Sequence, residues 1–339
     1  MKVSRVSVWS LLAWMGVASG SLAHAAEQQQ MKLAGKEVFF WAPPEAAGDE
    51  KQPVIFFSHG LGGCATQSVF LTEALADHGY WVFAPNHKDA KCVNGKATGA
   101  PEQSFRDPGK WTDQTYAGRA EDIRSLLGAL KKHEEYSKKI DVTRIGLVGH
   151  SLGGYTVLGL AGAWPRWTMP DVKAVLALSP YSRPYDLHKT LGKLQAPVMY
   201  QGGSFDLAIT PFIKRPGGSY DQTPAPKYFL EFGGAGHFAW TNRSNDRHPE
   251  IIRYALAFLD TYMKSETKES RTILTTKGPT LDTLRYDVSL PQSDETAQET
   301  EQQDETEQRR ERFRKQAAEH KKRIIPKPAA QPKSTLIPR

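Results

Sequence analysis

The chain of 339 residues lacks an apolar run long enough to cross a bilayer, a metal-ligand motif and an internal repeat. Its apolar segment over residues 6–17 falls short of the roughly 20 residues that a membrane-spanning helix needs. No spacing of histidine, cysteine and carboxylate residues resembles a metal site, so we expect no metal and no other cofactor. The absence of a repeat of fixed period excludes solenoid and propeller architectures.

A basic surface for nucleic acid is also missing, despite the formal net charge of +7. Residues 287–308 contain eight acids and no Lys or Arg, whereas residues 309–339 contain eleven bases and two acids. The rest of the chain is close to electrically ordinary, so the high isoelectric point comes mostly from the C-terminal tail. We therefore expect no nucleic-acid partner, and a charged, disordered tail over residues 287–339 whose partner is unknown.

The first 25 residues resemble a secretory signal peptide. Lys2 and Arg5 precede the apolar segment, and Ala23-His24-Ala25 forms a small-residue cleavage site. We expect export to the periplasm or out of the cell without a stable membrane anchor; an uncleaved anchor is the alternative. In such an oxidising compartment Cys64 and Cys92, which are the only cysteines, can pair as a disulfide, whereas in a cytosol they would be free thiols.

Between the two ends, short apolar runs alternate with helical patterns. Near-continuous apolar strands separated by helices indicate an α/β fold with a mostly parallel central sheet and helices on both faces. We expect this domain to span residues 31–265, with residues 266–286 as an extension that could add a strand or two. The predicted strands cover residues 37–42, 54–58, 80–85, 144–148, 172–178, 197–201 and 228–232, and the predicted helices cover residues 66–78, 116–132, 153–163 and 249–263.

A glycine-flanked serine follows the strand predicted over residues 144–148. Gly149-His150-Ser151-Leu152-Gly153 is a G-x-S-x-G pattern with a strand before it and a helix after it. So sharp a turn strains the serine backbone, and glycines on both sides avoid side-chain clashes. Free N–H groups at the helix N-terminus favour developing negative charge. The pattern predicts a nucleophilic Ser151; an accidental glycine-rich turn is the alternative.

A nucleophilic serine needs a base, and that base needs a carboxylate to orient it. We predict His237 as the base, because it follows the last apolar strand in a glycine-rich loop at the C-terminal edge of the sheet. Asp206 follows the strand over residues 197–201 and gives the chain order Ser…Asp…His. The open alternatives are His87 and His248 for the base, and Asp186 and Asp221 for the acid.

A second glycine-rich loop follows the strand over residues 54–58. In His59-Gly60-Leu61-Gly62-Gly63 the glycines free backbone N–H groups to point inward, so we predict that the N–H groups of Leu61 and Leu152 bind an oxyanion. The loop alone could bind phosphate, but no Gly-Lys-Ser/Thr ending follows it. With the usual strand order of this fold, a bridge between Cys64 and Cys92 would hold the loop in place.

Five stretches of the chain together carry a resemblance to a known superfamily: SHGLGG (58–63), HGYWVFAPNHKDA (78–90), AGRAEDIRSLLGAL (117–130), RIGLVGHSLGGYT (144–156) and GHFAW (236–240). They resemble the α/β-hydrolase superfamily, and most of all the bacterial dienelactone-hydrolase-like and platelet-activating-factor-acetylhydrolase-like esterases. The resemblance implies an α/β-hydrolase fold and a serine esterase with nucleophile Ser151, base His237 and oxyanion donors Leu61 and Leu152.

The chain departs from the acetylhydrolase branch at the acid. In that branch the acid follows the strand that here ends at Leu178, where this chain has Ser179-Pro180. Asp206 matches the later position that dienelactone-hydrolase-like and many lipase-like members use. The departure argues against a phospholipid-type substrate.

No long apolar insertion follows residue 179, so we expect no large lid domain and an open site. We expect a serine carboxylic-ester hydrolase that acts through an acyl-enzyme on small, short-acyl or soluble esters. The alternatives are an acyltransferase or a polyester or lipid-ester hydrolase with the same triad, and a non-catalytic cell-envelope binding protein. Five aromatic residues could line a pocket, although packing is their commoner role: Trp164, Trp167, Tyr181, Phe238 and Trp240.

Overall fold

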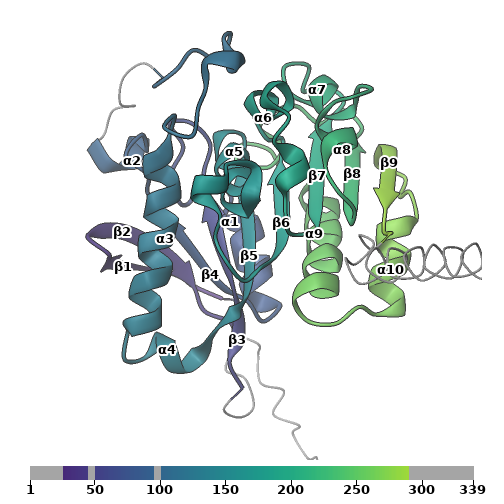
Figure 1. Cartoon of the computed structure of the whole chain (residues 1–339). Helices are drawn as coiled ribbons and strands as arrows, with labels where there is room; N and C mark the ends of the chain where they lie inside the picture. The colour runs from purple at the N-terminus through teal and green to yellow at the C-terminus, as the bar shows by residue number, and fades with distance from the viewer. Residues whose placement is uncertain (1–25, 45–49, 95–100, 290–339) are drawn as a thin grey trace, which may run out of the picture. The chain divides into compact units, whose positions relative to one another are not determined.

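A computed structural model describes residues 26–44, 50–94 and 101–289 (Figure 1). The predicted signal segment and residues 290–339 of the predicted tail lie outside the described residues. The described chain forms a nine-stranded sheet with the order β1-β2-β4-β3-β5-β6-β7-β8-β9. The strands are β1 Gln28–Leu33, β2 Lys36–Trp41, β3 Gln52–Ser58, β4 Trp81–Pro85, β5 Ile140–His150, β6 Val172–Leu178, β7 Val198–Gly203, β8 Lys227–Phe232 and β9 Leu281–Asp287.

The sheet is parallel in its centre and antiparallel at its two edges. Strands β4, β3, β5, β6, β7 and β8 run parallel, whereas β1, β2 and β9 join by antiparallel pairing. The predicted mostly parallel α/β architecture is therefore confirmed. The C-terminal ends of all the parallel strands lie along the same edge of the sheet, which runs across the strand ends rather than along an outer strand. The loops that follow these strands can therefore share a site there.

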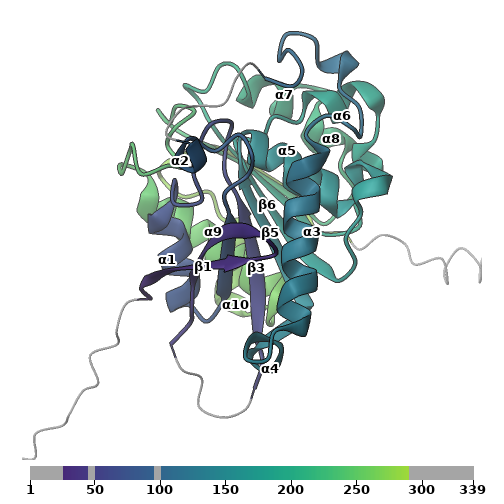
Figure 2. The same ribbon diagram turned by 90° about the vertical axis from the view of Figure 1, so that its left-hand side faces the viewer.

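Both faces of the sheet are covered by helices, as Figures 1 and 2 show. In β3, Val54 and Phe56 pack on the side of α3, whereas Ile55 and Phe57 pack on the side of α1 and α9. Burial on both faces explains why this strand is apolar throughout. The helices are α1 Val69–Asp77, α2 Lys91–Asn94, α3 Ala117–Lys132, α4 Tyr136–Lys139, α5 Leu152–Leu158, α6 Arg183–His188, α7 Thr210–Lys214, α8 Ser219–Gln222, α9 His248–Met263 and α10 Lys268–Thr275.

Several elements differ from the prediction. Strand β1 was not predicted because its sequence, QQQMKL, has no apolar alternation and pairs only with β2 at the edge. The helix expected over residues 153–163 leaves α-geometry after Leu158, and Gly162 has a φ of 122°. Helix α10 and strand β9 occupy the interval 266–286 that the sequence left undecided.

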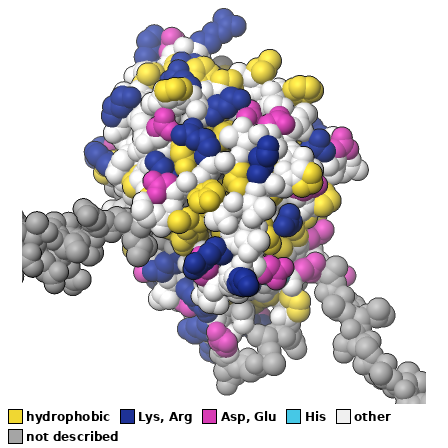
Figure 3. Space-filling model, turned by 90° about the vertical axis from the view of Figure 1, so that its right-hand side faces the viewer, with side chains coloured by type: hydrophobic (Ala, Val, Ile, Leu, Met, Phe, Trp, Pro, Cys, Tyr) yellow, Lys and Arg dark blue, Asp and Glu magenta, His cyan; other side chains and the backbone are white. Residues whose placement is uncertain are grey.

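Strand β9 is the outermost strand of the sheet on the side that faces the viewer in Figure 3. Its Arg285 pairs with Asp221 at 2.6 Å and lies over the Tyr220 ring at 4.2 Å, which fastens β9 to α8. On this face, basic and acidic side chains are interspersed with hydrophobic ones. Among the described residues, no helix is both long and apolar enough to cross a membrane.

Candidate active site

Ser151 lies in the tight turn between β5 and α5. Its backbone has a φ of 57° and a ψ of −115°, a strained combination for a residue with a side chain. A Cβ on Gly149 would lie 2.3 Å from the Gly153 carbonyl oxygen, and a Cβ on Gly153 would lie 1.9 Å from the Ser58 carbonyl oxygen. Gly149 is therefore needed for the turn itself to form, and Gly153 is needed for the turn to pack against the end of β3.

The structure brings the three predicted catalytic side chains together. The Ser151 hydroxyl lies 3.0 Å from Nε2 of His237, and Nδ1 of His237 lies 3.1 Å from Oδ2 of Asp206. These residues follow β5, β8 and β7, whose C-terminal ends share one edge of the sheet. Asp206 is buried, whereas the His237 side chain is 29% exposed and reaches the pocket. An imidazole placed between a hydroxyl and a carboxylate can take a proton from the hydroxyl.

Ser179 is a fourth member of this arrangement that the sequence reasoning missed. Its hydroxyl donates to Oδ2 of Asp206 and lies 2.8 Å from Nδ1 of His237. The backbone of Ser179 has a φ of 43°, and its N–H donates to the carbonyl of Gln201 at 2.7 Å. The available signal was its position directly after β6, where the acetylhydrolase branch places its acid.

The alternative bases lie elsewhere. His87 is fully buried, its Nδ1 donates to Asp122 at 2.8 Å, and its Nε2 lies 2.9 Å from the hydroxyl of Ser58. Burial lowers the pKa of His87 to about 4. His248 stacks on the ring of Phe70 with centroids 3.4 Å apart. Neither histidine contacts Ser151.

The alternative acids are also engaged elsewhere. Asp186 accepts a hydrogen bond of 2.6 Å from Ser219, and burial raises its pKa to about 6. Asp221 pairs with Arg285 on β9. Neither carboxylate contacts His237, so Asp206 is the acid that the geometry supports.

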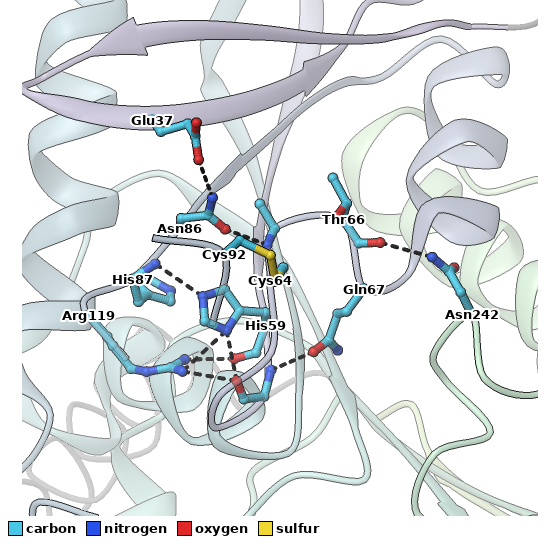
Figure 4. Close-up of a disulfide and its surroundings, with 12 residues drawn as sticks. Glu37, His59, Cys64, Thr66, Gln67, Asn86, His87, Cys92, Arg119 and Asn242 are labelled. Atoms are coloured by element: carbon cyan, nitrogen blue, oxygen red, sulfur yellow. Dashed lines mark hydrogen bonds between the residues drawn. A yellow bond between two sulfur atoms is a disulfide. The ribbon is translucent and has the colours of Figure 1, made fainter. Parts of the chain in front are cut away.

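Arg119 on α3 supports the predicted oxyanion loop, residues 59–63, through hydrogen bonds to its backbone (Figure 4). This buried guanidinium donates to the carbonyls of His59 at 2.7 Å and of Gly60 at 3.2 Å. The Gly60 carbonyl belongs to the same trans peptide as the Leu61 N–H, so that N–H points away from Arg119. Bonds to the carbonyl also polarise the peptide and strengthen its N–H as a donor.

Asp89 completes this support. It accepts two bonds from Arg119, at 3.0 and 2.7 Å, and one of 3.2 Å from the N–H of Gly62. Burial is the largest single effect and raises the pKa of Asp89, but the charge and hydrogen bonds of Arg119, together with His59 and the N–H of Gly62, lower it to about 2. The second predicted donor, the N–H of Leu152, lies in the first turn of α5, where a helix offers no backbone acceptor.

Gln67 and His150 link the predicted oxyanion loop to the loop that carries His237. Gln67 accepts from the N–H of Gly60 at 3.0 Å and donates to Nδ1 of His150 at 3.1 Å. Nε2 of His150 then donates to the backbone carbonyl of His237 at 2.8 Å. Burial lowers the pKa of His150 to about 3, so its ring is neutral and supplies one donor and one acceptor. These hydrogen bonds fix the position of one loop relative to the other.

The predicted disulfide joins Cys64 and Cys92 beside the same loop (Figure 4). Lys91, next to Cys92, donates its backbone N–H to the carbonyl of Gly63 at 3.3 Å. The bridge therefore ties the end of the oxyanion loop to α2, as the sequence reasoning anticipated.

Replacing both cysteines with serine is expected to lower the free energy of unfolding. The bridge spans a sequence separation of 28 residues, for which the loss of chain-closure entropy gives about 3–4 kcal/mol. Urea denaturation of the oxidised wild type and of the double variant measures this difference. Dithiothreitol should bring the wild type to the value of the variant and leave the variant unchanged. An equal midpoint for the two oxidised proteins would contradict the prediction.

A pocket of about 440 Å³ opens beside Ser151. Of the five aromatic residues considered from the sequence, Phe238 lines it, and the other four are buried in packing. Leu61 and Phe105 add apolar surface that the sequence reasoning had not assigned to a pocket. Within the described ranges, no group of three or more His, Cys, Asp or Glu side chains could hold a metal ion.

Comparison with known families agrees with this geometry. The profile of the family described as PET hydrolase-like matches residues 107–285, which is more than half of the chain. The chain belongs to the PET hydrolase-like family. The matched segment contains Ser151, Asp206 and His237, together with Ser179. A second profile, platelet-activating factor acetylhydrolase isoform II, matches residues 40–111, which include the oxyanion loop.

Curated relatives of this PET hydrolase-like chain include cutinases. It is 26% identical over 217 residues to Cutinase est2 of Thermobifida alba, covering 63% of this chain and 61% of that protein. Cutinase 2 of Thermobifida cellulosilytica is 25% identical over 216 residues, covering 63% and 70%. Bis(hydroxyethyl) terephthalate hydrolase of Streptomyces coelicolor is 23% identical over 175 residues, covering 51% and 52%. The alignment thus spans less than two thirds of the length of Cutinase est2.

Proposed function

We propose that this protein is a serine hydrolase of carboxylic esters. The observation that carries the proposal is the continuous chain from the hydroxyl of Ser151 through His237 to Asp206 at the wall of an open pocket. A serine oxygen becomes an effective nucleophile when a neighbouring base takes its proton. The oxyanion loop and its buried support add the element that such a reaction needs most, fixed donors for the developing negative charge.

The reaction proceeds in two halves. Ser151 Oγ attacks the ester carbonyl carbon while Nε2 of His237 takes the hydroxyl proton, and the N–H groups of Leu61 and Leu152 bind the resulting oxyanion. The carbon–oxygen bond to the alcohol then breaks, and His237 returns the proton to the leaving alcohol. Water repeats the sequence on the acyl-enzyme, which releases the carboxylic acid and restores Ser151.

We propose a polyester and its soluble fragments as the substrate class. The names of the relatives, cutinases and a bis(hydroxyethyl) terephthalate hydrolase, support esters of this kind. The site itself supports them through exposed apolar side chains on three loops at one edge of the sheet, a type of surface that commonly contacts a partner or substrate. Their exposures are 42% for Leu61, 73% for Phe205, 76% for Leu207 and 50% for Phe238.

Hydrolysis of 4-nitrophenyl butyrate by the purified protein tests the proposal. We expect turnover with an initial burst of 4-nitrophenol equal to the enzyme concentration if deacylation is slower than acylation. Added methanol should compete with water only in proportion to its concentration, whereas an acyltransferase would transfer the acyl group preferentially. Release of soluble acid from an aliphatic polyester film tests the polymer. The absence of turnover on every ester would contradict the proposal.

A further inference from the structure

The pocket beside Ser151 carries positive charge without a matching negative charge. Lys91 at the start of α2 and Arg243 in the loop after β8 both line it, and no described Asp or Glu does. The two cations belong to segments about 150 residues apart in the chain that meet at this pocket. Neither the apolar side chains of the pocket nor the proposed reaction of Ser151 requires these two cations.

Both cationic residues are held in place by contacts with their neighbours. The Arg243 guanidinium lies 4.9 Å from the centre of the Phe238 ring, and Phe238 itself lines the pocket. The backbone N–H of Arg243 also donates to the hydroxyl of Thr241 at 3.3 Å. Lys91 is fixed at its backbone by Gly63 and by the neighbouring disulfide. In the described part of the chain, neither cation forms an ion pair with a carboxylate.

Two acids that support the site do not pair with these cations. Asp89 is paired bidentately with Arg119, and Asp206 is buried behind the pocket wall, where it contacts Ser179 and His237. His150 is neutral, so it adds no charge of its own. A second hollow, which shares His237 and Phe238 with this pocket, is lined by one charged carboxylate and one guanidinium, those of Asp246 and Arg247, so its charges balance.

We propose that this pocket selects esters that carry a free carboxylate, such as half-esters of dicarboxylic acids. The inference rests on the proposed function and adds a subsite to it. Arg243 can bind a carboxylate through two parallel N–H···O bonds, and Lys91 adds a point charge from the start of α2. A pocket of this size holds a bound ester within the range over which such charges act, about 10 Å at 0.1 M salt.

The proposal also places the reaction within a sequence. Carboxylate-ended esters arise when an earlier ester hydrolysis has cut a polyester or a diester, because each such cut leaves one acid and one alcohol. This protein would then consume the half-ester with one water and release a dicarboxylate, an alcohol and one proton. The class of reaction that supplies its substrate is therefore prior esterolysis.

A matched pair of substrates tests the inference. Mono-4-nitrophenyl adipate and its methyl ester differ only in whether the far end of the acyl chain is a carboxylate or a neutral ester. We expect the ratio of their kcat/KM values, charged over neutral, to be about 5- to 10-fold higher in the wild type than in the Lys91→Gln/Arg243→Gln double variant at 20 mM NaCl. Raising NaCl to 500 mM should lower the wild-type ratio by a similar factor.

Two further variants control for structural effects. Arg243→Glu should lower the ratio more than Arg243→Gln does, because it replaces attraction by repulsion. Arg253→Gln is the matched control, since Arg253 on α9 also lies over an aromatic ring, that of Tyr254 at 5.7 Å, but not in the pocket; it should leave the ratio unchanged. The neutral ester could be turned over while the ratio stays the same in the double variant, in Arg243→Glu and at high salt. That result would overturn the inference and leave the proposed function standing. Turnover of neither ester would overturn the proposed function, and the inference with it.

Discussion

Replacement of Ser151 with alanine is expected to lower kcat for ester hydrolysis by about 10,000-fold or more, since nothing else at the site can form the acyl-enzyme. Its hydroxyl lies 3.0 Å from the His237 imidazole and opens to the pocket. A fluorophosphonate probe should label the wild type at Ser151 and fail to label Ser151→Ala. Mass spectrometry of the labelled peptide, together with the loss of turnover, measures both effects.

A second serine in the molecule provides a matched control. The hydroxyl of Ser58 lies 2.9 Å from Nε2 of His87, whose Nδ1 lies 2.8 Å from Asp122, so the distances resemble those of the Ser151 site. Ser58 and His87 are fully buried, and Lys36 pairs with the same Asp122 at 2.7 Å. With its pKa near 4, His87 is also a weak base at neutral pH.

Ser58→Ala should therefore keep ester turnover within about 3-fold of the wild type and keep the probe label. The change removes the contact with His87 and a long bond of 3.4 Å from Arg119, which keeps its shorter bonds to His59 and Gly60. The expected cost is about 1 kcal/mol of stability for each lost hydrogen bond, which thermal unfolding would detect. If Ser58→Ala removed the label while Ser151→Ala kept it, the nucleophile would be assigned to the wrong serine. The comparison separates triad-like distances from access to substrate.

The sequence could predict that the three candidate catalytic side chains converge, because their positions follow from topology. Ser151, Asp206 and His237 lie in the turn or loops that follow strands β5, β7 and β8, and these strands lie in one parallel run of the sheet. Parallel strands end at the same edge, so residues after them converge whatever their separation in the chain. The G-x-S-x-G pattern then marks which strand carries the nucleophile.

The groups that support this site could not be predicted in the same way. Arg119 sits on an amphipathic helix, where a charged residue usually faces solvent, yet here it is buried beneath the oxyanion loop. Gln67 contacts Gly60 and His150 through side-chain atoms whose directions depend on the loop conformation. The convergence of Lys91 and Arg243 also requires the packed loops. Local sequence patterns predict where strands end, but they do not predict where the side chains of separate loops point.

Replacement of Asp206 with alanine is expected to lower kcat by about 1,000- to 10,000-fold, because the carboxylate orients His237 and stabilises its protonated form. Asp206 is buried and lies 3.1 Å from Nδ1 of His237. Steady-state kinetics on 4-nitrophenyl butyrate measure the loss. Asp186→Asn is the control, since Asp186 contacts Ser219 rather than His237 and should retain activity within a few-fold. Loss of activity in Asp186→Asn with an active Asp206→Ala would reverse the assignment.

Ser179 allows a sharper test of the same acid site. Its hydroxyl bridges Asp206 and His237, so Ser179→Ala should cost about 10-fold in kcat in the wild type. If Ser179 acts through Asp206, the same change should cost much less in the Asp206→Ala background, which a double-mutant cycle measures. Equal costs in the two backgrounds would show that Ser179 acts independently of the carboxylate.

The position of Ser179 also offers a rescue. Its Oγ lies 2.8 Å from Nδ1 of His237, so a carboxylate introduced there can meet the same imidazole from the end of β6. Its φ of 43° is one that aspartate tolerates better than most residues. Ser179→Asp combined with Asp206→Ala should therefore recover about 10- to 100-fold of the activity that Asp206→Ala loses. Because a merely structural role for Asp206 would not be replaced from a different strand, such recovery would identify its contribution as the orientation and charge stabilisation of His237.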